Sequence, residues 1–322
     1  MDPADLPKYS DLPAFEKTGD RYAWGSFGEG DELGTIGLLT PERVLAASRL
    51  VKKGRVINLS LTLDTPRTLY HGETRSGYRH NMTVNRGGRD DTLDNFAMQG
   101  SSQWDGLRHV RYREFGYWGG LQDEDVDGKG RLGIEHWSQH GIIGRGVLID
   151  AARHYELAGE PLDATKRVAI GGAEIEAIAG AHGVDLQEGD ILLLRTGWLR
   201  WFMALSDQEK EALRGRLNPG EAGLDMPGLD PSTATAAWLW DHRIAAIAAD
   251  NPALEALRVD AEVGFQHRRL IALQGMAIGE LWDLEALSQD CAGDGVYEFM
   301  LVSAPLNVPG AVGSPANAYA VK

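Results

Sequence analysis

Segments with the patterns of helices and of short apolar strands follow one another along almost the whole chain, without the strict alternation of a regular parallel barrel. Apolar runs bounded by turn residues predict strands, and capping residues before apolar residues at helical spacing predict helices. Strands are expected at 56–63, 147–150, 190–195, 244–249 and 296–303, and helices at 40–53, 173–182, from 206, at 232–242 and at 263–273. This mixture predicts an α/β fold, organised as a single domain around a sheet with mixed strand directions.

Two helix starts carry clear local signals. Thr40-Pro41-Glu42 combines a capping hydroxyl, a proline at the first helical position and an acid in the first turn. Ser206 followed three residues later by Glu209 forms a capping box. The segment from residue 1 to 35 is polar, aromatic and rich in glycine, and we expect it to be an N-terminal arm that packs on the remainder, 36–322.

Charge and cysteine content exclude several classes of partner. The formal net charge of the 322 residues is −15, so the chain should repel nucleic acid and anionic membrane surfaces. Cys291 is the single cysteine, which rules out an internal disulfide and fits a reducing compartment. The first residues lack a basic region followed by an apolar stretch, and no apolar run approaches the length of a membrane helix. We therefore expect a cytoplasmic protein with a small-molecule substrate.

Polar side chains crowd into the segment from Gln99 to His109, interleaved with small residues that allow tight turns. Gln99, Gln103, Asp105 and His109 could converge there, with Asp105 supplying anionic oxygen and His109 a proton carrier near neutral pH. Trp104 could form a pocket wall, although core packing explains an aromatic residue equally well. A surface loop whose side chains bond its own backbone is the alternative for the whole segment.

Two further residues extend this set. His267 lies in the expected helix 263–273, and Glu280 follows the apolar residues 276–278. They can meet if the helix folds back on a following strand, and histidine with carboxylates is a ligand set for zinc or manganese. A metal there would polarise a carbonyl and activate a water molecule. A satisfied core or surface histidine and a capping or exposed glutamate remain the alternatives. The chain has no Gly-x-Ser-x-Gly nucleophile elbow.

These segments resemble the metal-dependent cyclase family that includes bacterial kynurenine formamidase and isatin hydrolase. The signature His-x-Gly-Thr-His-x-Asp-x-Pro-x-His falls on residues 99–109, where Asp105 and His109 match and both earlier histidines are replaced, by Gln99 and Gln103. The resemblance extends over nearly the whole chain, through segments 24–42, 144–150, 189–198 and 304–317. A branch of the family carries Gln-x-x-x-Gln-Trp-Asp at this place.

The resemblance implies a swivelling β/β/α fold, usually oligomeric, so we expect a homodimer or homotetramer with 36–322 as the catalytic domain. It implies that metal is held by Asp105, His267 and Glu280, with Gln99 and Gln103 in the two remaining ligand places, and that His109 transfers protons. Amide oxygen is a harder ligand than imidazole nitrogen, so this ligand set is expected to favour manganese or magnesium over zinc.

The resemblance also implies hydrolysis of an amide, a cyclic imide or a lactone of a small molecule by metal-activated water. Two other functions fit the same residues. One is a metal-free cyclase or dehydratase with Asp105 and His109 as acid and base, and the other is a non-catalytic small-molecule binder. The substrate itself is decided by pocket walls that the fold does not specify.

Overall fold

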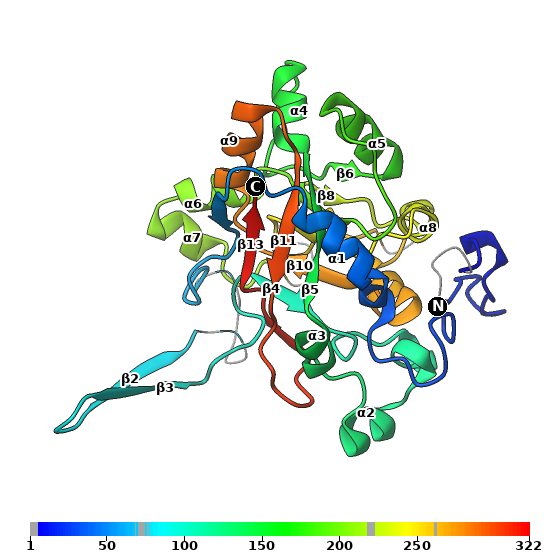
Figure 1. Cartoon of the computed structure of the whole chain (residues 1–322), viewed down its shortest axis with the longest axis horizontal. Helices are drawn as coiled ribbons and strands as arrows, with labels where there is room; N and C mark the ends of the chain where they lie inside the picture. The colour runs from blue at the N-terminus through cyan, green and yellow to red at the C-terminus, as the bar shows by residue number, and fades with distance from the viewer. Residues whose placement is uncertain (1–5, 68, 70–74, 76, 218–222, 261–262) are drawn as a thin grey trace.

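A curled nine-stranded sheet forms the centre of the protein, shown in Figure 1 as a computed structural model. The structure describes residues 6–67, 69, 75, 77–217, 223–260 and 263–322. The strand order in the sheet is β1-β13-β11-β5-β7-β9-β10-β4-β12. The strands are β1 (Val56–Asn58), β4 (Gln103–Asp105), β5 (Ile142–Asp150), β7 (Ile191–Arg195), β9 (Ala246–Ala249), β10 (Ala277–Glu280), β11 (Glu298–Ser303), β12 (Gly313–Pro315) and β13 (Ala318–Val321).

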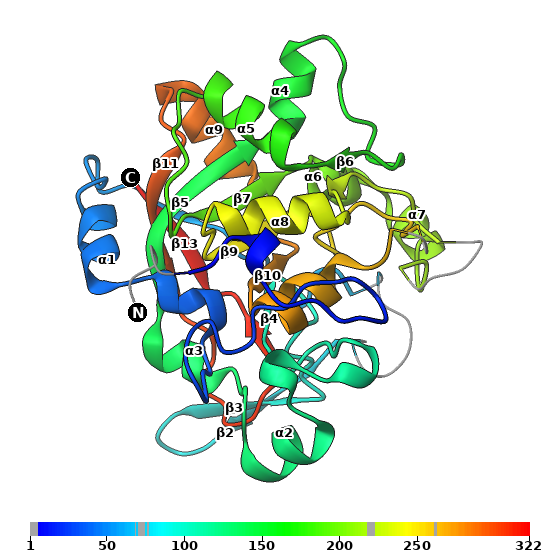
Figure 2. The same cartoon turned by 90° about the vertical axis from the view of Figure 1, so that its right-hand side faces the viewer.

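The sheet is parallel in its middle and antiparallel on both flanks. Strands β5, β7, β9 and β10 pair in parallel, whereas every other neighbouring pair in the sheet is antiparallel. The residues of β7 and β9 are all buried, as expected for parallel strands covered on both faces. Helix α1 packs against β5 and β11, and α5 and α8 lie on the other side of the sheet (Figure 2). The fold is therefore α/β with one large mixed sheet, as the sequence predicts.

The helices surround this sheet and are mostly short. They are α1 (Pro41–Ser48), α2 (Asp123–Lys129), α3 (Glu135–His140), α4 (Ala151–Leu157), α5 (Gly172–Ala181), α6 (Trp198–Ala204), α7 (Asp207–Ala212), α8 (Thr233–Asp241), α9 (Glu285–Asp294) and the π-helix η7 (Arg268–Leu273). Two-residue strands β6 (Ala169–Ile170) and β8 (Gly228–Leu229) pair separately, beside the main sheet. Within the described part of the chain, none of the helices has the length and apolar character that a membrane crossing requires.

The predicted elements are present, with shifted ends. Thr40 and Ser206 cap α1 and α7 through their side chains, and Glu209 completes the capping box. Helix α1 ends at Ser48, earlier than the expected residue 53, and the strand expected at 56–63 is reduced to β1. The helix expected at 263–273 begins at Gln266 and continues as the π-helix η7, a conformation that is frequent at functional sites.

An antiparallel ribbon and the N-terminal segment complete the chain. Strands β2 (Arg79–Val84) and β3 (Arg89–Asp94) form a two-stranded ribbon that projects from the body (Figure 1). The described part of the segment 1–35 begins at Leu6 and packs on η7. There the Ala23 amide donates to the Leu273 carbonyl over 2.7 Å, and the Arg269 guanidinium pairs with Asp20. Residues 1–5 of this expected arm lie outside the described residues.

Candidate metal centre

Antiparallel pairing of β4 with β10 brings two of the expected site segments together. Gln103 lies opposite Glu280, and Asp105 lies opposite Ile278. Because side chains alternate along a strand, Gln103, Asp105 and Glu280 project from one face of this pair. Gly279 allows the side chain of Ala248 in the neighbouring strand β9 to approach closely, since a Cβ at position 279 would lie 2.6 Å from the Cβ of Ala248.

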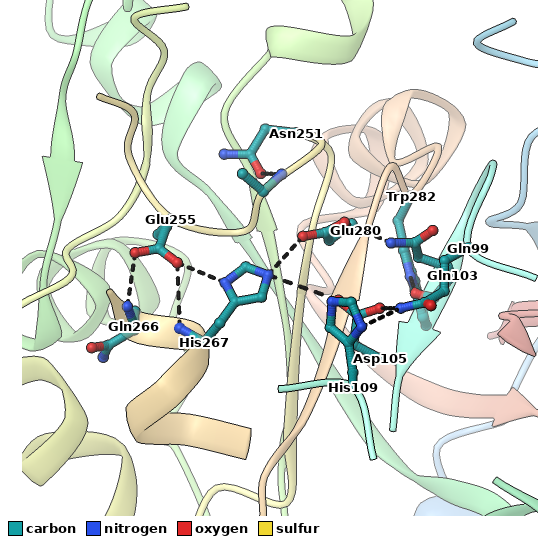
Figure 3. A network of polar contacts seen from close by, with 11 residues as sticks. Gln99, Gln103, Asp105, His109, Asn251, Glu255, Gln266, His267, Glu280 and Trp282 are labelled. Carbon is teal, nitrogen blue, oxygen red and sulfur yellow. Dashed lines mark hydrogen bonds and ion pairs between the residues drawn. The ribbon is translucent and has the colours of Figure 1, made fainter. Parts of the chain in front are cut away.

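Asp105, His267 and Glu280 form a buried cluster, which we name the three-residue centre (Figure 3). One oxygen or nitrogen from each residue lies within 4.8 Å of the other two. His267 Nε2 is 3.0 Å from Glu280 Oε1 and 3.8 Å from Asp105 Oδ2. The structure thus brings together three residues that are 175 positions apart at the extremes, as the sequence analysis expected.

The ionisation of this centre is set by burial and by the excess of acids. Burial and the charge of Asp105 raise the pKa of Glu280 to about 7, against the opposing effect of His267. Burial alone would lower the pKa of His267, but hydrogen bonds to Glu255 and Glu280 outweigh it and raise this pKa to about 10. Without a bound cation, His267 is therefore an imidazolium held between two carboxylates.

The two glutamines hold the carboxylates of the centre through their amide nitrogens. Gln103 Nε2 donates to Glu280 Oε2 over 2.6 Å, and Gln99 Nε2 donates to Asp105 Oδ1. Gln99 Nε2 also lies 3.1 Å from His109 Nδ1. Both glutamines therefore lie beside the three-residue centre, and their predicted role as metal ligands stays a prediction. Their amide nitrogens contact the acids, while the buried amide oxygen of Gln103 has no hydrogen-bond partner among the described residues.

His109 lies at the solvent side of the centre. Its side chain is 22% exposed, whereas that of Asp105 is 1% exposed, and the Nε2 atom of His109 is 3.7 Å from Asp105 Oδ2. Burial lowers the pKa of His109, with Asp105 opposing the shift and His267 adding to it. A neutral imidazole that a substrate can reach suits it to accept a proton at neutral pH.

Trp104 lies on the opposite face of β4, in the hydrophobic core. Its side chain is fully buried, its indole nitrogen donates to Ser303 Oγ over 2.8 Å, and its ring packs edge-on against Trp282. Core packing, the alternative given for Trp104, describes these surroundings. The expected role as a pocket wall is not supported by this position, and Trp104 is left out of the proposed site.

Glu255 contacts His267 of the three-residue centre and was not among the residues predicted from the sequence. Its carboxylate lies 2.6 Å from His267 Nδ1, on the side of the ring away from Asp105 (Figure 3). The available signal was an acid inside the apolar segment 253–257, directly after the predicted strand 244–249. A fully buried carboxylate in such a segment needs a partner, but nothing in the sequence indicates that His267 is that partner.

The residues of the centre fit a divalent cation. Asp105 Oδ2 and Gln103 Oε1 are buried oxygens for which the described part of the chain supplies no hydrogen-bond partner, and such atoms are costly unless something binds them. His267 donates from Nδ1 to a carboxylate and directs Nε2 at the acids, the usual arrangement of a metal-binding histidine. Carboxylate and amide oxygens with one imidazole are ligands for manganese, magnesium or zinc.

Comparison with known proteins assigns the family. A family model described as Cyclase matches residues 57–256, which is more than half of the chain. The chain belongs to the cyclase family. A crystal structure of a novel cyclase has 31% sequence identity to this cyclase, covering 98% of this chain and 100% of that one with a TM-score of 0.81. None of the curated proteins compared with the sequence matches it.

More distant cyclase relatives share the fold. Isatin hydrolase A from Labrenzia aggregata, in a structure with bound benzyl benzoate, is 15% identical over 87% of this chain and 97% of that chain, with a TM-score of 0.57. Isatin hydrolase A from Ralstonia solanacearum is 16% identical with the same coverage and TM-score. The family model and the 31% identical crystal structure confirm the family resemblance, and all of these structures share the α/β fold predicted from the sequence.

Proposed function

We propose that this cyclase is a metal-dependent hydrolase that cleaves the C–N or C–O acyl bond of a small amide, cyclic imide or lactone. The observation that carries the proposal is the three-residue centre, in which two buried carboxylates and one imidazole offer ligand atoms within 4.8 Å of one another. Asp105 Oδ2 supports it, because this buried oxygen accepts no hydrogen bond from a residue that the structure describes, and a cation would satisfy it.

Asp105, His267 and Glu280 would hold the cation, with the amide oxygen of Gln103 beside them. A divalent cation at this place supplies electrophilic activation of a carbonyl and of the attacking water. Manganese is the preferred ion for this set, because oxygen ligands outnumber the single imidazole.

The remaining chemistry falls to His109. Its neutral imidazole accepts a proton from the attacking water and returns that proton to the leaving nitrogen or oxygen. Gln99 orients this ring, since its amide group contacts both Asp105 and His109 Nδ1. The exposed edge of His109 allows the substrate to reach it from solvent.

The test combines metal binding with turnover. The protein is stripped with chelator, titrated with Mn²⁺ and Zn²⁺ by calorimetry, and assayed on N-formyl arylamines, isatins, cyclic imides and lactones. We expect turnover that requires the cation. Asp105→Asn should lose both binding and turnover, whereas His109→Ala should keep the cation and lose at least 100-fold in kcat, the usual contribution of a general acid–base residue.

Three results would contradict the proposal. Turnover that resists chelator in the wild type and is abolished by His109→Ala would indicate a metal-free acid–base enzyme. Tight ligand binding without turnover of any of these compounds would indicate a binding protein. A wild-type protein that binds neither Mn²⁺ nor Zn²⁺ would remove the basis of the assignment.

A further inference from the structure

Glu255 lies in a loop that the structure fixes at several points. The loop follows β9, and its backbone pairs with Leu229 of β8 through Leu229 N to Leu254 O and Ala256 N to Leu229 O, both 2.9 Å. Asn251 secures the start of the loop, since its side chain donates to Pro227 O over 2.8 Å and its carbonyl accepts from Leu281 N. The Glu255 carboxylate is therefore held at a defined position relative to β10.

Both oxygens of this carboxylate are used at the start of the helix that carries His267. Oε2 accepts from the backbone N–H of Gln266 over 2.8 Å, and Oε1 accepts from the backbone N–H of His267 over 3.3 Å. Oε1 also lies 2.6 Å from Nδ1 of the His267 ring. One carboxylate thus contacts the backbone and the side chain of the same residue, which fixes the rotation of the imidazole as well as its position.

The contact between Glu255 and Nδ1 determines which nitrogen of the His267 ring can bind a cation. With Nδ1 donating to Glu255, a neutral imidazole has its lone pair on Nε2, which faces Glu280 and Asp105 (Figure 3). The opposite tautomer would place a proton on Nε2 and block a cation. Phe265 stacks on the ring with centroids 4.6 Å apart and so restrains its plane, but it does not distinguish the two nitrogens.

We propose that Glu255 is the positioning residue of the cation site, which holds His267 in the tautomer and orientation that direct Nε2 to the ion. The inference rests on the proposed function for the identity of the bound species. The new element is the role of Glu255, which lies on the far side of the imidazole and is placed to touch neither the ion nor the substrate.

The informative variant is Glu255→Gln, which keeps the shape and replaces one accepting oxygen by a donating amide group. The amide N–H can face Nδ1 only if an unprotonated Nδ1 accepts its hydrogen bond, which requires the ring proton to lie on Nε2. If the amide instead faces the backbone, a buried N–H is left without an acceptor. The first arrangement removes the preference for a free Nε2, and the second weakens the attachment of His267 to the loop. In both cases we expect Mn²⁺ and Zn²⁺ to bind 10- to 100-fold more weakly, the usual effect of losing such a partner.

The control variant is Asp250→Asn. Asp250 is also a fully buried carboxylate. It accepts hydrogen bonds from Thr196 and Gly197, and none of its side-chain hydrogen bonds within the described residues involves the three-residue centre. The substitution makes the same chemical change, carboxylate to amide, and reports the general effect of such a change on stability. Its affinity for Mn²⁺ and Zn²⁺ should stay within about twofold of the wild type.

Proton NMR of ¹⁵N-histidine-labelled protein provides a readout without metal. The 2.6 Å contact should give the Nδ1 proton of His267 a far-downfield resonance, assigned by its loss in His267→Gln. We expect this resonance in the metal-free wild type and in Asp250→Asn, and its loss in Glu255→Gln. Persistence of the resonance in Glu255→Gln, or unchanged cation affinity in that variant, would overturn the inference. A wild type that shows the resonance and binds no cation would overturn the proposed function alone.

Discussion

Replacement of Glu280 by glutamine should stabilise the metal-free protein, although Glu280 is proposed as a ligand. The introduced side chain would be isosteric. Its amide oxygen could accept from Nε2–H of the His267 imidazolium, and its amide nitrogen could donate to Gln103 Oε1 after the Gln103 amide turns over, so both contacts of the carboxylate survive. What disappears is the charge. The pKa of Glu280 is raised from 4.5 to about 7 because burial and Asp105 disfavour ionisation more than His267 favours it.

The size of the effect follows from that shift. An acid with a raised pKa in the folded state destabilises the protein increasingly as pH rises from the unfolded to the folded pKa, and the full penalty is present above the latter. A shift from 4.5 to about 7 corresponds to roughly 3 kcal/mol at pH 8 and to less than about 1 kcal/mol at pH 5. The free energy of unfolding of Glu280→Gln in chelator should therefore exceed that of the wild type at pH 8 and approach it at pH 5.

Urea unfolding followed by tryptophan fluorescence measures this difference, with chelator or with Mn²⁺ present. Mn²⁺ at 100 times its Kd should stabilise the wild type by about 2.7 kcal/mol and the variant hardly at all. Glu298→Gln is the control, because Glu298 pairs with Arg145 on the surface of β11, and its loss should destabilise the protein under both conditions. A metal-free Glu280→Gln that is less stable than the wild type at pH 8 would refute the reasoning.

Three further predictions concern other parts of the molecule. Cys291 is buried and its thiol has a pKa raised to about 12 by burial, so thiol reagents at pH 8 should label it only as fast as the protein unfolds, and rapid stoichiometric labelling of the native protein would contradict this. Trp104→Phe should lower the free energy of unfolding by about 1–3 kcal/mol through lost packing and the lost contact to Ser303, while calorimetry shows unchanged Mn²⁺ affinity. Asp20→Asn should weaken the contact to Arg269 and lower stability by roughly 1–3 kcal/mol in urea unfolding, and an unchanged midpoint would show that the N-terminal segment does not secure η7.

The parts of the fold that sequence predicts correctly depend on local chemistry. Thr40 and Ser206 cap helices because a side-chain oxygen satisfies an amide three residues away, which any chain with that spacing can achieve. The strands at 191–195 and 246–249 are apolar runs between turn residues, a pattern that requires no knowledge of the partner strand. The ends of elements are less predictable, since α1 ends at Ser48 although the first glycine that follows it is Gly54.

The candidate site is predictable only in part, because its geometry is non-local. Asp105, His267 and Glu280 were recognised through a family motif and by position, and their meeting depends on the register of β4 against β10. Glu255 could not be found in this way. Its role depends on the loop after β9 passing beside the first turn of the following helix, and no spacing in the sequence encodes that approach.

The charge balance of the centre gives the strongest physical reason for a cation. Three buried carboxylates, Asp105, Glu255 and Glu280, share one imidazole, and the two glutamines that contact them are neutral. Arg75 adds a positive field that lowers the pKa of Glu280, yet burial and Asp105 still raise that pKa above its ordinary value. Glutamine in place of histidine thus leaves the acids oriented but not neutralised. A divalent ion would remove this imbalance, so the residues that destabilise the empty centre are those expected to bind the ion most tightly.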